Sequence, residues 1–219
     1  MNKTIRLILN IFMAGAVAGA WVHMYAAGGG MLSGEGLSNL RYYTVLSNIL
    51  EGIASVLLVI ALTAAARKQK PLPRWVEVLK YIAAVSVLLT FTIVVAFFGP
   101  LYGHGNLYQG ANLWFHLIIP VIAVAEMVFL SDCKLTARDN RLALYPTILY
   151  GVVYTANNMI NGIGEWPDTN DWYGFLLWGY PVGILLFACI GAVTWFLGWI
   201  LRAGHNKTIT KKSNALNNE

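Results

Sequence analysis

Apolar residues fall along this chain in long blocks separated by short polar breaks, and they do not alternate with polar residues. A helical block of about 20 apolar residues matches the ~30 Å hydrocarbon core of a bilayer. The chain contains six such blocks, each of which predicts a membrane-spanning helix. The expected spans cover approximately residues 5–27, 41–66, 75–99, 108–130, 142–161 and 173–201.

This pattern predicts an all-α integral membrane protein built as one six-transmembrane-helix bundle over residues 1–205. A polar, disordered tail is expected at 206–219. The composition agrees with a membrane protein, because 58% of the 219 residues are hydrophobic and only 11% are charged. A soluble domain is typically about 25% charged. The first apolar block runs to about Ala27 with no soluble domain after it, so it is interpreted as a span and not as a cleaved signal peptide.

The basic residues predict the orientation. Except for Arg41, every Lys and Arg falls on the same side of the predicted membrane, and Lys80 lies just inside the third span on that side. Basic loops stay in the cytoplasm, so both termini are expected to be cytoplasmic. The net charge of +5 does not indicate nucleic acid, because the bases lie in short loops without exposed aromatic residues. The other basic residues are Lys3, Arg6, Arg67, Lys68, Lys70, Arg74, Lys134, Arg138, Arg141, Arg202, Lys207, Lys211 and Lys212.

Polar residues form a stripe on the second predicted span. Thr44, Ser47, Asn48 and Glu51 are spaced i, i+3, i+4 and i+7, which places them on one helical face. A carboxyl group at this depth usually faces a bundle interior or a watery cavity. Alternatively, the hydroxyl and amide groups only form hydrogen bonds between helices.

A second polar stripe is expected on the fourth span. Gln109, Asn112 and His116 are spaced i, i+3 and i+7, at a depth that overlaps the first stripe. Pro120 has no N–H, so the carbonyl of His116 loses its usual donor and a kink is expected there.

Together the stripes suggest a nucleophile and a base. A threonine hydroxyl needs a base to take its proton, and neutral imidazole is the usual base near neutral pH. Thr44 and His116 are therefore the candidate catalytic pair. Glu51 could orient His116 or be a protonated structural carboxyl, and Asn48 and Asn112 could stabilise an oxyanion.

The fifth span adds a stripe of Tyr150, Tyr154, Asn157 or Asn158, and Asn161, which could bind substrate. The aromatic residues that follow it, Trp166, Trp172 and Tyr173, are expected to form an interfacial belt. Arg41 could pair with a fatty acid carboxylate or extend to lipid headgroups.

Three segments resemble a known family. "YYTVLSNIL" on the second span, "FHLIIP" on the fourth and "WYGF" before the last are similar to the androgen-induced protein family. This resemblance implies hydrolysis of fatty acid esters of hydroxy fatty acids (FAHFA) within the membrane, with Thr44 as nucleophile and His116 as base. It also implies a bacterial relative, located in the inner (plasma) membrane. The family often has Tyr-Pro-Phe where this chain has Tyr173-Gly174-Phe175.

Two other functions are open on the sequence alone. Glu51, Glu126 and the fifth-span stripe could line a path in a small transporter or channel, although no inverted repeat is visible. A non-catalytic membrane scaffold would use the stripes only for packing. The expected partners are membrane lipids and a lipid ester or fatty acid substrate; no protein partner is indicated.

No cofactor is expected, because the chain has no cofactor motif. In principle, His23, His116 and Glu51 could hold a metal. Cys133 and Cys189 do not suggest a disulfide framework.

Overall fold

The computed structural model describes residues 3–28, 34–165 and 169–216, and every regular element in these ranges is helical. The longer helices are α1 (Lys3–Ala27), α2 (Tyr43–Lys68), α3 (Arg74–Ile93), α7 (Ile119–Leu130), α9 (Tyr145–Asn161) and α10 (Tyr180–Leu216). The short α-helices are α4 (Gly99–Tyr102), α5 (His104–Leu107), α6 (Ala111–Leu113) and α8 (Ala137–Leu142). A 3-10 helix, η1, covers Gly36–Arg41, and two π-helical turns, η2 and η3, cover Val94–Phe98 and Trp114–Ile118.

Five of the described helical segments are long and apolar enough to cross a membrane: Lys3–Ala27, Tyr43–Lys68, Arg74–Tyr102, Ala111–Leu130 and Tyr180–Ala215. The prediction of an all-helical, multi-pass membrane protein is therefore confirmed. Helix α9 has 17 residues and rises about 26 Å, less than the ~30 Å hydrocarbon core. The sixth span accordingly stays a prediction.

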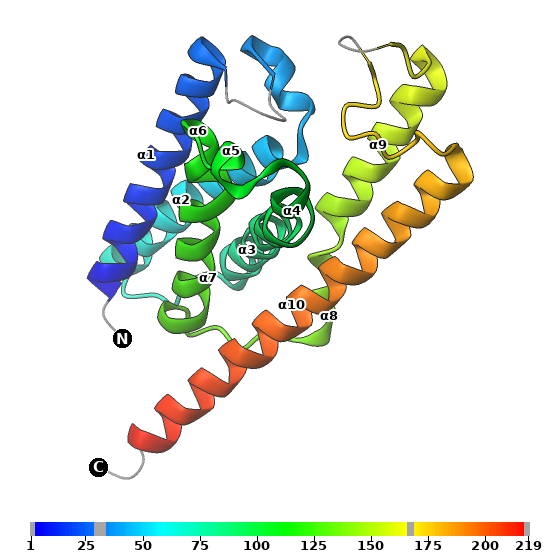
Figure 1. The fold of residues 1–219 in the computed structure, drawn as a ribbon. Coiled ribbons are helices and arrows are strands. Elements are labelled where there is room, and N and C mark those ends of the chain that lie inside the picture. The colour runs from blue at the N-terminus through cyan, green and yellow to red at the C-terminus, as the bar shows by residue number, and fades with distance from the viewer. Residues whose placement is uncertain (1–2, 29–33, 166–168, 217–219) are drawn as a thin grey trace.

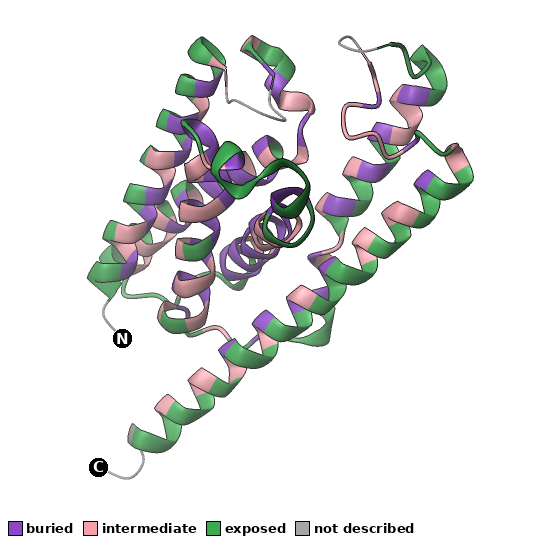
Figure 2. Ribbon diagram, viewed as in Figure 1, coloured by how far each residue is buried: buried purple, intermediate pink, exposed green. Residues whose placement is uncertain are grey.

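Helix α3 lies at the centre of the bundle, in contact with α2, α7, α9 and α10. Helix α1 packs on α2 and α7, whereas α9 and α10 form a pair beside this group (Figure 1). Gly52 allows close packing of α1 and α2, because a Cβ atom there would lie 2.9 Å from Cγ1 of Val17. Buried residues concentrate on α3, and large exposed apolar side chains cover α9 and α10 (Figure 2). These apolar faces fit contact with lipid.

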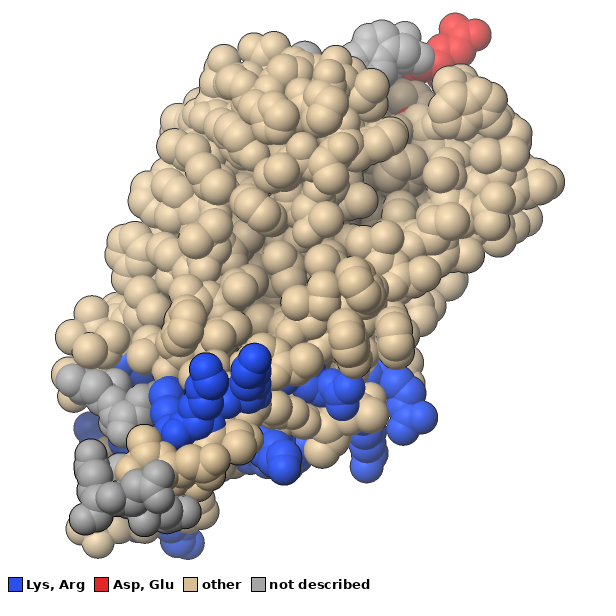
Figure 3. Space-filling model, turned by 60° about the horizontal axis from the view of Figure 1, so that its bottom comes forward, with Lys and Arg blue, Asp and Glu red and all other residues tan. Residues whose placement is uncertain are grey.

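Lys and Arg side chains gather at one end of the molecule (Figure 3). Both ends of the chain lie toward this same end (Figure 1). This basic end is interpreted as the cytoplasmic face under the positive-inside rule. The opposite end, which carries η1 and the segment between α9 and α10, is called the outer end below.

The last helix differs from the sequence prediction at both of its ends. It begins at Tyr180 and not at 173, with Pro181 in its first turn, where proline's missing N–H costs nothing. It continues to Leu216, so the described part of the expected disordered tail is helical. The reason is tertiary: Asn206 forms hydrogen bonds of 3.0 and 2.8 Å with the backbone N–H and carbonyl of Leu135. In addition, Nζ of Lys212 donates to the carbonyl of Phe129 at 2.6 Å.

Cysteine labelling tests whether α9 crosses the membrane. In a protein without Cys133 and Cys189, Asn161→Cys and Arg138→Cys place single thiols near opposite ends of α9. We expect a membrane-impermeant maleimide to label Asn161→Cys in intact cells and Arg138→Cys only after permeabilisation. Labelling of both thiols from the same side would show that α9 does not span.

Candidate functional site

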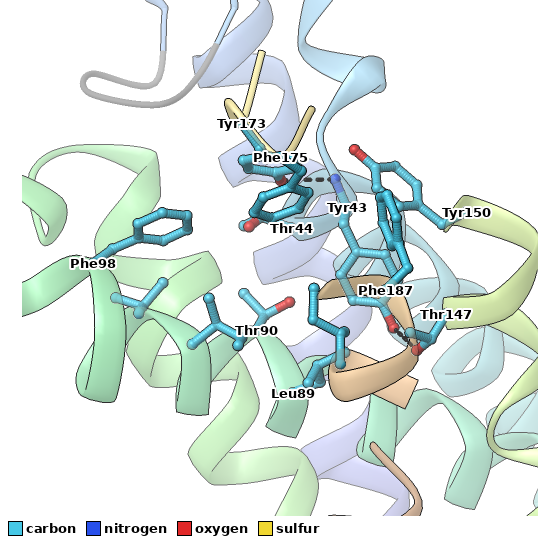
Figure 4. Close-up of a pocket in the computed structure, with 13 residues that line it drawn as sticks. Tyr43, Thr44, Leu89, Thr90, Phe98, Thr147, Tyr150, Tyr173, Phe175 and Phe187 are labelled. Carbon is cyan, nitrogen blue, oxygen red and sulfur yellow. Dashed lines mark hydrogen bonds between the residues drawn. The ribbon is translucent and has the colours of Figure 1, made fainter. Parts of the chain in front are cut away.

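Thr44 lines a small cavity in the outer half of the bundle (Figure 4). The cavity has a volume of about 60 Å³, room for no more than a few water molecules. It is lined by residues of α2, α3, η2, α9, α10 and the segment that precedes α10. Its walls are formed by Tyr43, Thr44, Leu89, Thr90, Ile93, Val94, Phe98, Thr147, Tyr150, Tyr173, Phe175, Phe187 and Ile190.

Tyr173 brings a second hydroxyl group to Thr44. The backbone N–H of Tyr43 donates to Oη of Tyr173 at 3.0 Å, and Tyr173 and Thr44 line the same cavity (Figure 4). Because Oη accepts the amide hydrogen, the hydroxyl hydrogen of Tyr173 is available to donate. The sequence pattern predicts Tyr173 in an interfacial belt. Only its place in "WYGF", a segment far from α2 in sequence, could have indicated this role.

The cavity is separated by single side chains from two apolar grooves. Tyr43 and Tyr150 also line a groove of about 320 Å³ between α2 and α9, with Arg41 at its outer end. Thr147 and Phe187 also line a groove of about 510 Å³ between α9 and α10. Oη of Tyr43 lies 2.9 Å from Oγ1 of Thr147, so one hydrogen bond closes the wall between α2 and α9.

His116 is buried, with 3% of its surface exposed, and lies in the π-helical turn η3. Its Nδ1 atom is 2.7 Å from the carbonyl oxygen of Leu107. A carbonyl can only accept, so Nδ1 carries the hydrogen and, in the neutral ring, Nε2 holds the free lone pair. This is the tautomer in which Nε2 can accept a proton.

The π-helical turn also accommodates Pro120. The N–H of Ile119 donates to the carbonyl of Trp114, five residues back, so the helix is locally wider where proline removes a donor. The irregularity that Pro120 predicts is therefore present as a π-helical turn. The predicted stripe is wrong in its geometry, however: the helix begins at Ala111, after Gly110 with φ of +53°. Gln109 therefore lies outside the helix, and the wider turn alters the spacing that relates Asn112 to His116. Asn112 itself is buried in α6.

Asn48 connects the segments that carry the two candidate catalytic residues. Its Nδ2 atom donates to the carbonyls of Thr44, at 2.8 Å, and Phe115, at 3.2 Å, and Phe115 precedes His116. These two bonds occupy both amide hydrogens, so in this structure Asn48 positions the backbone and does not donate to an oxyanion. Ser47 lies 3.0 Å from Oγ1 of Thr90, linking α2 to α3.

Glu51 lies at the foot of the stripe but has different partners. It forms a buried ion pair with Lys80, and Ser55 lies beside it. The described hydrogen bond of His116 goes to a backbone carbonyl and not to Glu51. The stripe is thus divided: its outer part belongs to the cavity and Glu51 to a separate charged cluster.

Arg41 lies over the rings of Tyr42 and Trp172, with its Cζ atom 5.3 and 5.6 Å from their centroids. Its Nε atom is buried without a hydrogen-bond partner, and among the described residues it forms no ion pair. The hydroxyl of Tyr150 donates to the Arg41 carbonyl at 2.7 Å. The two ring contacts therefore hold Arg41 in place, and its Nε atom forms no hydrogen bond.

Tyr154 and Asn158 fix the loop at the outer end. The Tyr154 hydroxyl donates to the carboxylate of Asp171, and Nδ2 of Asn158 donates to the carbonyls of Tyr154 and Asn170 at 3.0 and 2.9 Å. The Tyr154 hydroxyl also accepts a hydrogen bond from the backbone N–H of Tyr173 at 3.2 Å, so Tyr154 helps to position the residue that shares the cavity with Thr44. Trp166, named with the interfacial belt, lies outside the described residues.

No group of three His, Cys, Asp or Glu side chains within the described ranges is arranged to hold a metal ion. The histidine pair named for such a site is separated: His23 is exposed, and His116 is buried against Leu107. Burial raises the pKa of the Cys133 thiol, which favours the unreactive protonated form.

Comparisons with models of known protein families, with curated proteins and with solved structures gave no match to this chain. The function is therefore argued from the site itself.

Proposed function

We propose that this protein hydrolyses lipid esters within the membrane, with Thr44 as nucleophile and His116 as general base. The observation that carries the proposal is the hydrogen bond from Nδ1 of His116 to the Leu107 carbonyl. It leaves Nε2 as a proton acceptor in a buried site. Asn48 links the His116 segment to the backbone of Thr44, and Thr44 lines a cavity together with Tyr173.

The reaction would proceed by acyl transfer. The Thr44 oxygen attacks the ester carbonyl carbon while Nε2 of His116 accepts the hydroxyl proton. The tetrahedral intermediate collapses, the proton passes to the departing alcohol, and an acyl-threonine is left. A water molecule that loses its proton to the same nitrogen then releases the fatty acid and restores Thr44.

Tyr173 is the best-placed donor for the oxyanion. It lines the same cavity as Thr44, and its hydroxyl group is a donor as well as the acceptor of the Tyr43 N–H. The described residues show no hydrogen bond between Thr44 and His116 in this substrate-free state. Catalytic hydrogen bonds often tighten only when substrate binds, and the proposal requires this contact to form.

The surroundings of Thr44 fit a lipid substrate. The cavity is too small for an acyl chain, but the two adjoining grooves are apolar and lie between helices, where chains can enter from the bilayer. Rotation of Tyr43 or Phe187 would connect a groove with the cavity. Arg41 at the outer end of one groove suits a substrate with a carboxylate, such as a fatty acid ester of a hydroxy fatty acid.

Trapping of the acyl-enzyme tests the proposal directly. The protein in lipid nanodiscs would be incubated with a long-chain ester that has a good leaving group, then digested and examined by mass spectrometry. We expect an acyl group on Thr44, absent from Thr44→Ala and unaffected by Thr63→Ala, an exposed threonine of the same helix. Turnover with acylation of a different residue, or of none, would contradict the assignment of Thr44.

A further inference from the structure

Five ionisable side chains meet in the interior of the bundle toward its basic end. Arg6 comes from α1, Glu51 from α2, Glu77 and Lys80 from α3, and Glu126 from α7. Each is at most 5% exposed. The proposed hydrolysis uses none of them.

The cluster has two connected parts. In the first, Arg6 forms hydrogen bonds of 2.6 and 2.7 Å with the two carboxylate oxygens of Glu77 and one of 2.6 Å with Oε1 of Glu126. In the second, Lys80 pairs with Oε1 of Glu51. Nζ of Lys80 is also 3.9 Å from Oε2 of Glu126, which joins the two parts.

The charges in this cluster do not balance. Three carboxylates face two bases, so full ionisation would leave one net negative charge in the interior. An uncompensated buried charge is strongly unfavourable, and such groups usually neutralise. The cluster therefore needs one further positive charge to be balanced.

The hydrogen-bond pattern identifies where that charge would bind. Both carboxylate oxygens of Glu77 are satisfied by Arg6, and Oε2 also accepts from Ser131 at 3.0 Å. In contrast, Oε2 of Glu51 and Oε2 of Glu126 are buried without a hydrogen-bond partner, and both residues are 0% exposed. The two unsatisfied acceptors belong to the two carboxylates that share Lys80.

We propose that the cluster binds one exchangeable proton, shared between Glu51 and Glu126. The proton adds to a carboxylate oxygen and converts it to a hydroxyl donor, which removes the excess negative charge. Release of the proton to water restores the carboxylate. The protein thus contains an internal proton-binding site that is separate from Thr44 and His116.

The cluster borders a pocket at the basic end. This pocket has a volume of about 380 Å³, and Arg6 and Glu77 of the cluster line it. Its wall includes exposed bases such as Lys70 and the acidic Asp132. Water in this pocket can reach Glu77 and Arg6 at the edge of the cluster, whereas the outer cavity around Thr44 does not include any of the five residues.

Infrared spectroscopy in nanodiscs tests the proposal. Exposed carboxyl groups have pKa values near 4, so at neutral pH only a retained buried proton gives a protein carboxylic acid C=O band. The ester carbonyls of the lipid absorb in the same region but, unlike a carboxylic acid, do not shift in D₂O. We expect the wild-type protein to show this band, with a shift in D₂O. Glu51→Gln and Glu126→Gln should each remove it, because two carboxylates then face two bases. Glu165→Gln, which alters an exposed carboxyl group, should leave it unchanged.

The infrared results distinguish a bound proton from its alternatives. Absence of the band from the wild-type protein overturns the proposal. In that case, sodium or potassium binding that is lost in Glu51→Gln would identify a metal cation as the bound charge. A band that persists in both cluster variants would also overturn it. The wild-type measurement needs no substitution, so a variant that fails to fold does not remove the test.

Discussion

Thr44→Ala is expected to reduce kcat/KM for a long-chain ester by about 10³-fold or more, because it removes the attacking oxygen. His116→Gln should cause a loss of about 10²- to 10⁴-fold, the range for a general base. The two residues act in one step, so the double variant should be hardly slower than the slower single variant. Multiplicative losses would instead indicate independent roles.

Matched controls separate this chemistry from folding. Thr44→Ser keeps a hydroxyl and should retain substantial turnover, and His23→Gln alters an exposed histidine and should have little effect. All variants would be compared by thermal unfolding and gel filtration in the same detergent. Undiminished turnover in both Thr44→Ala and His116→Gln would exclude the pair. A flux assay in liposomes would then address the transporter alternative.

Lys80→Met should destabilise the protein by about 3–5 kcal/mol, the usual cost of removing one partner from a buried ion pair. The substitution leaves Glu51 without its base and increases the imbalance of the cluster. Adding Glu51→Gln should recover a large part of the loss, because the charge count returns to its original value. Thermal or denaturant unfolding in nanodiscs measures both effects.

The control lies in the same helix. Arg74→Met breaks a pair with Asp139 in which Arg74 is 50% and Asp139 5% exposed, so water screens it more than the Lys80–Glu51 pair, both of whose side chains are 0% exposed, and its loss should cost less. If Lys80→Met lowers the free energy of unfolding no more than Arg74→Met does, the buried ion pair of Lys80 does not stabilise the fold as predicted. Failure of Glu51→Gln to compensate would show that lost packing, and not charge, causes the instability.

The sequence was sufficient to predict the five helices that are long and apolar enough to cross a membrane, because apolar blocks depend on local composition. It also showed that Thr44 and Glu51 share one face of α2, since both lie in a regular helix. It could not show which neighbour each side chain meets. Lys80 was recognised as a base near the cytoplasmic side, yet its pairing with Glu51 follows from the packing of α2 against α3.

The other differences between prediction and structure arise where tertiary contacts override the local sequence pattern. A π-helical turn changes the number of residues per turn, so regular spacing cannot relate Asn112 to His116. The polar composition after residue 205 suggested disorder, but the bonds of Asn206 to Leu135 hold that segment in α10. Tyr173 reaches Thr44 only because the chain folds back before α10.

The length of α10 has a mechanical consequence. One uninterrupted helix of 37 residues, about 55 Å long, carries both Phe187 in the cavity wall and Asn206 at the basic end. Hydrogen bonds attach this one helix to the bundle along its length, from Thr194, which bonds to Thr147 in the cavity wall, to Asn206, which bonds to Leu135. A change in the tilt of α10 would therefore alter its contacts at the cavity and at the basic end together.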